Sequence, residues 1–357
     1  MSSTRIFLIR HAEAEGNIYR RAHGQFNGLL IGRAYAQIEQ LRERFLHENI
    51  DAVYSSDLSR TCVTATALSE TRGLEINTTK LLREVCVGEW EDVAWGNINH
   101  HFPEMSLLFN NDPARWSIAR SEDFKSVRER MRQCVQDIAT RHDGQTVAAF
   151  SHGFAIRALT CELMGIPSRE INRVPYCDNT AVALLLYERG KFTIEYHRDA
   201  SHLRSGTSTL DTQSWWRDEK KRISEELRYV PFDEDRDAEL LALCDRDLRL
   251  RSSANIRLTA LLENKPAGIL ELDTTRGCDD DIGWISRFFV RPEYCRRGFG
   301  AQLLGQSVSE YRKLRREKLC MEAVKSSPLM EFCKKYGFTV DDESGEICIL
   351  EKNIRNW

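Results

Sequence analysis

The sequence has no uninterrupted apolar run of about 18 residues, the length that a membrane-spanning helix requires. Its first residues enter an apolar segment directly, without the charged, apolar and small-residue pattern of a secretory signal peptide. It also has no large excess of one charge, because 51 Lys and Arg residues nearly balance 54 Asp and Glu residues. These absences argue against a membrane or nucleic-acid partner, and we expect a cytoplasmic protein that acts on small molecules.

The cysteines do not show the spacing that is typical of disulfide frameworks or metal sites. The 11 cysteines are scattered through apolar segments and nowhere show Cys-x-x-Cys spacing, so we expect reduced, buried thiols and no metal site. A length of 357 residues predicts two domains. All nine histidines lie at or before His202, so any histidine chemistry belongs to the first domain. The sequence leaves the oligomeric state open, a homodimer included.

Two apolar segments end in residues that suit phosphate chemistry. Residues 6–9 run directly into Arg10 and His11, and residues 147–150 lead through a serine to His152. The carboxyl ends of strands form the ligand-binding edge of an open α/β sheet, so both segments are expected to deliver their polar groups there. The planar guanidinium of Arg is permanently charged and offers several N–H donors to a phosphate. His can act as a nucleophile or a proton carrier near neutral pH.

Two further charged residues fit the same edge. Arg60 follows a third strand-like segment at residues 53–56, with Asp57 placed to cap the helix that carries it. Glu84 supplies a carboxylate in a Leu-Arg-Glu-Val segment. Each residue alone has an ordinary explanation: Arg60 as an exposed helix residue, Glu84 as an ion-pair partner, and His152 as a helix cap. Their order and placement together favour a phosphate site.

In this order, the segments resemble the histidine phosphatase superfamily, which includes the cofactor-dependent phosphoglycerate mutases. The resemblance covers about residues 4–203 and implies an α/β, three-layer, phosphoglycerate mutase-like domain. It also implies a set of catalytic residues and one residue that binds the substrate phosphate. The catalytic residues are His11, Glu84, His152, Arg10 and Arg60, and the substrate-binding residue is Asn17.

The resemblance also implies what each of these residues does. His11 is the nucleophile that becomes phosphohistidine, while Arg10 and Arg60 clamp the phosphate. His152 donates to the same phosphate oxygens, and Glu84 protonates the leaving alkoxide and later activates water. No metal or other cofactor is required, because two guanidiniums and an imidazole supply the positive charge.

Departures from the family pattern bear on the substrate. Residues 27–31 are apolar where the family often has a small polar residue, and Val87 replaces a usual aromatic. The domain is short and its loop after Trp95 is compact, so a phosphatase is expected in preference to a mutase, which must shield its phosphohistidine from water. Residues 92–120 are rich in aromatics without a clear period, and form either a lid over the site or a packing insertion.

The local pattern predicts elements and boundaries. A tight-turn signal at residues 188–190 predicts a hairpin of residues 180–187 and 191–197. Apolar spacing predicts helices over 28–46, 57–68, 123–141 and 154–164, with strands over 53–55 and 147–151. We expect a first domain at residues 1–205, a linker or bridging helix at residues 206–226, and a second domain at residues 227–357. In the bridging segment, Trp215, Trp216 and Ile223 would lie on one side of a helix.

The second domain carries a glycine turn between a strand and a helix. Its predicted order is strand 227–232, helix 237–249, strands 256–263, 267–273 and 284–290, then strand 319–324 and helix 328–336. Such a turn lets backbone amides and a helix N-terminus face one anion, which suits a pyrophosphate. The order from about residue 227 to residue 351 resembles the GNAT N-acetyltransferases.

This second resemblance implies a mixed α+β fold, bound acetyl-CoA and an amine acceptor. It assigns pantetheine to backbone groups of two strand residues and pyrophosphate to the glycine turn. The residues are Phe288 and Val290 on the strand, and Arg296, Arg297, Gly298, Phe299 and Gly300 in the turn. A Cβ at either glycine of the turn is expected to block the pyrophosphate.

Two cysteines depart from the acetyltransferase pattern. Cys295 replaces the usual Gln or Arg at the start of the turn, and Cys333 replaces the usual tyrosine, with Tyr336 too close to Gly337 to substitute for it. With an ordinary thiol pKa of about 8.5, Cys333 is a candidate acid for the departing CoA thiolate. Candidate bases are Glu271, Asp273 and Glu322.

Three classes of function remain open from the sequence. The first is a bifunctional phosphatase and acetyltransferase acting on a small phosphorylated metabolite and an amine. The second is a phosphatase whose acetyltransferase-like domain only senses CoA. A mutase-type enzyme is an alternative to the phosphatase in either case. The third, a phosphate-binding scaffold, is disfavoured by the complete set of catalytic residues.

Overall fold

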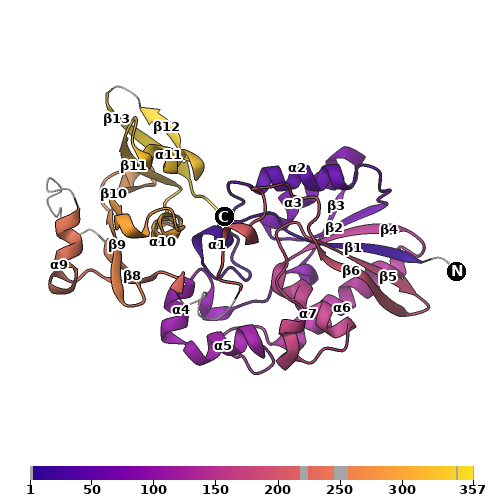
Figure 1. The fold of residues 1–357 in the computed structure, drawn as a ribbon. Coiled ribbons are helices and arrows are strands. Elements are labelled where there is room, and N and C mark those ends of the chain that lie inside the picture. The colour runs from indigo at the N-terminus through magenta and orange to yellow at the C-terminus, as the bar shows by residue number, and fades with distance from the viewer. Residues whose placement is uncertain (1–2, 218–223, 245–255, 343–344, 357) are drawn as a thin grey trace. The chain divides into compact units, whose positions relative to one another are not determined.

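A computed structural model describes residues 3–217, 224–244, 256–342 and 345–356 (Figure 1). The chain divides into two compact units. The first unit comprises residues 1–14, 22–91 and 102–216, and the second comprises residues 15–21, 92–101 and 217–357. No helix in the described ranges is both long enough and apolar enough to cross a membrane.

A six-stranded sheet in the order β3-β2-β4-β1-β5-β6 forms the first unit. Its strands are β1 (Thr4–Arg10), β2 (Ala52–Ser56), β3 (Ile76–Thr79), β4 (Thr146–Ser151), β5 (Val182–Glu188) and β6 (Lys191–Asp199). The first four strands are parallel, whereas β5 runs antiparallel to β1 and forms the expected hairpin with β6. The short, polar sequence of β3 gave no strand signal.

Helices cover both faces of this sheet. They are α2 (Ala34–Arg44), α3 (Ser59–Ser69), α6 (Phe124–Arg141) and α7 (Gly153–Leu163), while α5 (Pro103–Asn111) packs on α7. Figure 1 shows α2 and α3 on one side of the sheet and α6 and α7 on the other. The three-layer α/β architecture expected from the sequence is therefore confirmed.

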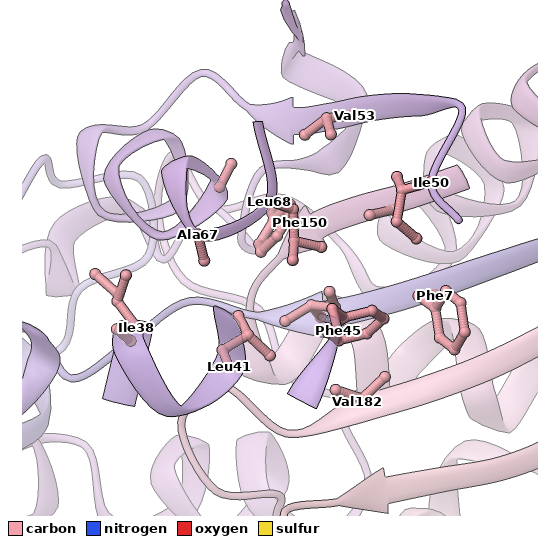
Figure 2. Packing of buried hydrophobic residues seen from close by; sticks show 14 of the residues in the cluster. Phe7, Ile38, Leu41, Phe45, Ile50, Val53, Ala67, Leu68, Phe150 and Val182 are labelled. Atoms are coloured by element: carbon pink, nitrogen blue, oxygen red, sulfur yellow. The ribbon is translucent and has the colours of Figure 1, made fainter. Parts of the chain in front are cut away.

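A buried apolar cluster joins α2 and α3 to the sheet (Figure 2). Phe7 of β1 meets Phe45, the residue that caps the end of α2, edge to face, with ring centroids 4.8 Å apart. Leu68 of α3 and Phe150 of β4 belong to the same cluster. Because successive side chains of a strand face opposite sides, Phe7 points to this layer while Leu8 lines a small cavity with residues of α7. The two faces of β1 thus hold the three layers together.

Two helix starts differ from the sequence prediction. Helix α2 begins at Ala34, because Gly32 has a φ of +55° that interrupts the apolar period. Helix α3 begins at Ser59 without a side-chain cap, so the capping role expected of Asp57 is wrong. Asp57 instead forms two hydrogen bonds with Arg83, at 2.5 and 2.6 Å. This paired geometry is stronger than a single cap bond, and it lowers the pKa of Asp57.

Residues 204–216 pack against the first unit, although their composition predicted a linker. Thr209 Oγ1 donates to Glu13 Oε1 at 2.8 Å, and its backbone N–H donates to Asp178 Oδ1 at 3.0 Å. Ser208 is buried and donates to the other oxygen of Asp178. The polar residues of this segment therefore satisfy buried carboxylates. Ile223 lies outside the described residues, so the predicted side of the bridging helix is not described in full.

The aromatic segment at residues 92–120 is divided between the units. Residues 102–120 belong to the first unit, where Phe109 of α5 stacks on Phe154 at a centroid distance of 4.9 Å. Trp116 is 2% exposed and lies against both Phe109 and Trp90. This part has the packing role that the sequence left as one of two alternatives, and a lid role remains a prediction.

The second unit contains a seven-stranded sheet in the order β12-β13-β11-β10-β9-β8-β7. Its strands are β7 (Arg228–Pro231), β8 (Ile256–Leu262), β9 (Lys265–Asp273), β10 (Ile282–Val290), β11 (Lys318–Val324), β12 (Thr339–Asp342) and β13 (Ile347–Asn353). Strands β10 and β11 are parallel, and the other neighbours are antiparallel. The last two strands had not been predicted.

Helices of the second unit come from three parts of the chain. They are α1 (Glu15–Tyr19), α4 (Trp95–His101), α9 (Glu234–Leu243), α10 (Phe299–Lys313) and α11 (Pro328–Lys335). Helix α9 matches the start of the predicted helix 237–249, whose last five residues lie outside the described ranges. Helices α1 and α4 precede residue 200 but belong to this unit. The second unit is therefore not a purely C-terminal domain.

Candidate active site

Two histidines lie at the ends of neighbouring parallel strands. Arg10, the last residue of β1, is in register with Ser151, the last residue of β4. His11 and His152 follow directly, and the N–H of His11 donates to the carbonyl of Ser151 at 3.0 Å. Their ring centroids are 5.2 Å apart with an interplanar angle of 57°. The strand register thus brings the two predicted histidines together.

The ring of His11 is held in one tautomer. Its Nδ1 lies 2.7 Å from the carbonyl oxygen of Ala12. A carbonyl can only accept, so Nδ1 carries the proton and Nε2 keeps a free lone pair. Burial lowers the pKa of His11, and the positive charges of Arg60 and Arg10 lower it further. His11 is therefore a neutral imidazole with Nε2 available as a nucleophile.

Three side chains outside the predicted set hold the backbone of this loop. Asn179 Nδ2 donates to the carbonyl of His11 at 2.9 Å, and Thr64 Oγ1 accepts from the N–H of Ala12 at 2.9 Å. Gln37 Oε1 accepts from the N–H of Glu13 at 2.7 Å. None of these residues belongs to a local motif. Their role became visible only when the fold brought them beside His11.

Arg60 is 2% exposed and sits beside His152. Its Nε donates to His152 Nδ1 at 3.2 Å, so the ring proton of His152 lies on Nε2, 3.0 Å from Ser56 Oγ. The other guanidinium nitrogens donate to the carbonyls of Phe26 and Gly24 at 2.8 and 2.7 Å. Burial lowers the pKa of Arg60 to about 10, which still leaves a cation at neutral pH.

Burial and the nearby cation also lower the pKa of His152, so it is a neutral donor through Nε2. Ser56, the last residue of β2, was not among the predicted site residues. Its position at a strand end, like those of Arg10 and Ser151, was the signal that could have found it. The site therefore uses the ends of three adjacent strands.

Arg10 has a buried donor without a partner. Its Nη1 donates to the carbonyl of Cys177 at 2.6 Å, but its Nε has no hydrogen-bond partner among the described residues. A Cβ built on Gly153 would lie 3.2 Å from that Nε, so the glycine leaves room for the guanidinium. A buried guanidinium donor of this kind can be satisfied by an anionic oxygen.

Glu84 binds the N-terminus of α7. Its carboxylate accepts from the N–H groups of Phe154 and Ala155 at 2.9 and 2.8 Å, and from that of Val85 at 3.0 Å. Burial raises the pKa of Glu84, and these backbone hydrogen bonds together with the charge of Arg60 oppose the rise. A carboxyl with a raised pKa is suited to deliver a proton.

Asn17 lies in α1, which belongs to the second unit. It is partly buried there, and its contact with a substrate phosphate remains a prediction. Among the residues that the structure describes, no group of three His, Cys, Asp or Glu side chains is placed to hold a metal ion.

The glycine turn of the second unit fits a pyrophosphate group. Gly298 precedes α10 with a φ of +88°, and Arg296 also has a positive φ of +62°. Helix geometry gives the N–H groups of Gly298, Phe299 and Gly300 no acceptor within α10. Residues 295–298 are exposed, so the turn itself, including Gly298, can be reached by an anion.

Strand β10 is open where pantetheine was expected. Its parallel pairing with β11 ends at Ile285, opposite Met321, whereas its pairing with β9 continues to Val290. Among the described residues, the stretch from Ser286 to Val290 thus has a partner strand on one side. An extended ligand can pair with the other edge, which includes the predicted residues Phe288 and Val290.

The two glycines of the turn have different surroundings. A Cβ on Gly300 would lie 3.0 Å from the ring of Phe332 in α11, so a side chain there would disturb the packing of α10 whatever its effect on a bound anion. A Cβ on Gly298 would meet nothing within 4 Å. Gly298 is required for its positive φ, and Gly300 for the packing of α10 on α11.

The expected chemistry of Cys333 is also corrected. Cys333 is fully buried, its Sγ lies 3.3 Å from the sulfur of Met321, and burial raises its pKa to about 12. The ordinary thiol pKa expected from the sequence is therefore wrong, and the thiol has no exposed surface from which to protonate a leaving group.

The three candidate bases already have partners. Glu271 is 3% exposed and lies 3.8 and 3.9 Å from Arg257 and Arg287. Asp273 accepts hydrogen bonds in the turn after β9, which help to lower its pKa. Glu322 is exposed and pairs with Arg276 at 2.9 Å. All three carboxylates are therefore already engaged by other groups of the protein.

Comparison with known proteins identifies two families. The model of the histidine phosphatase superfamily (branch 1) matches residues 6–200, and that of the acetyltransferase (GNAT) family matches residues 212–338. Phosphoserine phosphatase 1 of Hydrogenobacter thermophilus is 27% identical over 208 residues, covering 54% of this chain and 98% of that protein. A probable phosphoglycerate mutase of Proteus mirabilis is 27% identical over 205 residues, covering 56% and 94%.

Among solved structures, YhfR of Bacillus stearothermophilus is similar with a TM-score of 0.55 and 28% identity. The likeness covers 56% of this chain and 100% of that one. These findings confirm both resemblances drawn from the sequence and the two fold classes they imply.

Proposed function

Since residues 6–200 make this chain a member of the histidine phosphatase superfamily, we propose that it is a metal-independent phosphomonoesterase that acts through phosphohistidine. The observation that carries the proposal is the geometry of His11. Its Nδ1–H is bound to a carbonyl, so its free Nε2 lies at the strand-end site where Arg10 Nε has no partner. A phosphate monoester supplies a phosphorus atom that His11 Nε2 can attack and a negatively charged oxygen that can accept from Arg10 Nε.

The reaction takes place in two displacements. His11 Nε2 attacks phosphorus, the bond to the alkoxide oxygen breaks, and Glu84 gives its proton to that oxygen. Water then attacks the phosphohistidine, Glu84 takes its proton, and the nitrogen–phosphorus bond breaks to release phosphate. Arg10, Arg60 and His152 donate to the phosphoryl oxygens, whose charge they balance in both steps.

The substrate is proposed to be a small phosphorylated metabolite. One relative is a phosphoserine phosphatase and another is a probable phosphoglycerate mutase, so phosphorylated hydroxy and amino acids are the first compounds to test. A mutase-type activity remains the alternative for this domain. All eleven cysteines are free thiols, which suits the reducing cytoplasm where we propose that the protein acts.

A panel of phosphomonoesters tests this proposal. We expect phosphate release from at least one small phosphorylated acid, with turnover unchanged by EDTA, because cationic side chains do the work of a metal. Loss of turnover in EDTA and its return with a divalent ion would contradict the mechanism. Isomerisation of phosphoglycerate without phosphate release would identify a mutase instead.

We further propose that the second domain binds acetyl-CoA. The turn at residues 295–300 would hold the pyrophosphate, and the open edge of β10 would pair with pantetheine. The bound group supplies an activated acetyl thioester. Transfer to an amine is the second proposed activity, and a non-catalytic CoA-sensing role is the alternative. The sensing role is favoured by one observation: the candidate acid is buried and the candidate bases are already paired.

Titration calorimetry of the full chain with acetyl-CoA tests cofactor binding. Gly298→Val should weaken binding by at least about tenfold, because a β-branched residue resists the left-handed conformation that exposes the amides. Gly190→Val is the matched control, since Gly190 has a φ of +79° and equally open space in the β5–β6 turn. Absence of heat with the wild-type chain, or equal binding by Gly298→Val, would refute the assignment.

Release of free CoA from acetyl-CoA in the presence of an amine panel separates the two roles. Amine-dependent release would establish the bifunctional enzyme. Binding without release would support the sensing role.

A further inference from the structure

Residues 204–211 connect the two regions that the family models match, and they lie outside both regions. This connecting segment (residues 204–211) nevertheless belongs to the first unit, where a buried carboxylate holds it. Asp178 Oδ1 accepts from the N–H of Thr209 at 3.0 Å, and its Oδ2 accepts from the hydroxyl of Ser208. Ser208 and Thr209 are both buried. The middle of the connecting segment is therefore fixed on the first unit.

The connecting segment holds the side chain of Gln37, a fully buried residue of α2. Gln37 Nε2 donates to the carbonyl of Thr207 at 2.8 Å and to Thr209 Oγ1 at 3.1 Å. The carbonyl can only accept, and the hydroxyl of Thr209 gives its own proton to Glu13 Oε1 at 2.8 Å. Both partners therefore require the NH2 end of the amide on this side. The oxygen of the amide is left for the backbone after the nucleophile.

This oxygen binds the peptide group between Ala12 and Glu13. Gln37 Oε1 accepts from the N–H of Glu13 at 2.7 Å. The N–H of Glu13 and the carbonyl of Ala12 belong to one planar peptide group, so fixing the first also fixes the second. The carbonyl of Ala12 is the acceptor for His11 Nδ1, 2.7 Å away. The orientation of the Gln37 amide is thus transmitted to the ring of the nucleophile.

The same contacts decide which ring nitrogen can attack. The ring of His11, whose pKa is lowered by burial, carries a single proton. Gln37 and Ala12 are 0% exposed and Glu13 is 2% exposed, so water has little access to these groups. A buried N–H that loses its acceptor is costly, and the peptide group would turn to find another partner. Its carbonyl would turn with it, and the proton of His11 could then occupy Nε2, the nitrogen that must attack phosphorus.

We propose that Gln37 is a positioning residue of the phosphatase, through which the connecting segment keeps the ring proton of His11 on Nδ1. This inference rests on the proposed phosphatase function. Gln37 binds the backbone beside the nucleophile and not the reacting atoms. Its loss should therefore slow the attack of Nε2 more than it weakens binding of the substrate.

Single-turnover kinetics of Gln37→Met test the proposal on the full chain. Methionine is similar in size to glutamine but has neither end of the amide, so formation of the phosphoenzyme from an aryl phosphate should slow by about 10²-fold. The substrate concentration at half-saturation should stay within about threefold of wild type. Thr209→Val removes one of the two acceptors of Gln37 Nε2 and should slow the same step by about three- to tenfold. Thr209→Ser, which keeps the hydroxyl, should restore the rate.

Thr4→Val is the matched control for these variants. Thr4 is also a buried threonine, and its hydroxyl lies 3.2 and 3.1 Å from the carbonyls of Ala139 and His142. It is the first residue of β1, at the opposite end of the strand from Arg10. Thr4→Val should lower the unfolding temperature to a similar extent as Thr209→Val, because both lose a buried hydroxyl. It should not slow formation of the phosphoenzyme.

Nitrogen NMR of the histidine-labelled chain gives a readout that does not depend on activity. The ¹⁵N chemical shift shows whether a ring nitrogen carries a proton, and the signals of His11 are those missing from His11→Ala. We expect the Nδ1-protonated tautomer in the wild type and in Thr4→Val. Gln37→Met and Thr209→Val should show the Nε2-protonated tautomer as well.

Two results would overturn the positioning role. One is an unchanged tautomer of His11, and the other is an unchanged rate of phosphoenzyme formation, in folded Gln37→Met. Thr209→Val takes the place of Gln37→Met in both comparisons should the latter fail to fold. Lack of hydrolysis by the wild-type chain would instead refute the phosphatase function, while the tautomer would still show whether Gln37 holds the ring.

Discussion

Replacement of His11 by alanine should lower turnover of an aryl phosphate by about 10⁴-fold or more, because the phosphoenzyme cannot form without Nε2. The neighbouring His152 does not replace it. Its Nδ1 accepts from Arg60 and its Nε2 carries the proton, so it has no free lone pair to offer. Initial rates with an aryl phosphate measure the effect directly.

His142→Ala is the control for this variant. His142 lies in the same unit but hydrogen-bonds Tyr54 and Gln145, outside the group of residues at the strand ends. It should keep turnover within about threefold of wild type, as expected for a side chain away from the chemistry. Acid-labile, base-stable phosphate bound to the wild-type chain, absent from His11→Ala, would identify the intermediate. Near-normal turnover by His11→Ala would exclude this nucleophile.

Replacement of Glu84 by glutamine should lower hydrolysis of an alkyl phosphate by about 10²- to 10⁴-fold, the contribution of a positioned general acid. The loss for an activated aryl phosphate should be much smaller, because its leaving group departs without a proton. Glutamine keeps an acceptor oxygen for the N–H groups of Phe154 and Ala155, so the start of α7 should remain in place. Equal losses for both substrates would show that Glu84 positions and does not protonate.

The pH profile provides a second test of the same acid. Burial raises the pKa of Glu84, so the carboxyl stays protonated to a higher pH than an ordinary glutamate. The lowered pKa of His11 keeps the nucleophile neutral in acid. Alkyl phosphate hydrolysis should therefore fall as pH rises through the pKa of Glu84. Glu84→Gln should lack this limb, and its persistence there would assign the limb to another group.

The arrangement of the candidate site residues could be predicted because it depends on strand ends. Arg10 and His152 each follow an apolar segment, and parallel strands bring their carboxyl ends to one edge of a sheet. Asp57 shows the limit of local reasoning. Its spacing suited a helix cap, but Arg83, 26 residues later, offers two hydrogen bonds and takes the carboxylate. Competition between a local and a distant partner is not visible in a local pattern.

The residues that hold the loop around His11 in place could not be predicted for a related reason. Asn179 and Thr209 lie far along the chain from His11 and Glu13, and neither has a motif around it. The same holds for Glu15, which looked like an ordinary first-turn acid of a short helix. Its partner Arg312 lies in α10, 297 positions later in the chain, and only the packing of α10 revealed it.

The pairing of Glu15 with Arg312 also bears on synthesis by the ribosome. The two residues are 297 positions apart, so the segment after the nucleophile is made early and its partner almost last. Domains that emerge first generally fold first, and contacts between distant positions form late because closing a long loop is slow. A nascent chain that has already folded its first sheet would still lack a settled α1. The second unit therefore cannot be complete until nearly the whole polypeptide has been made, because it is built from segments near both ends of the chain.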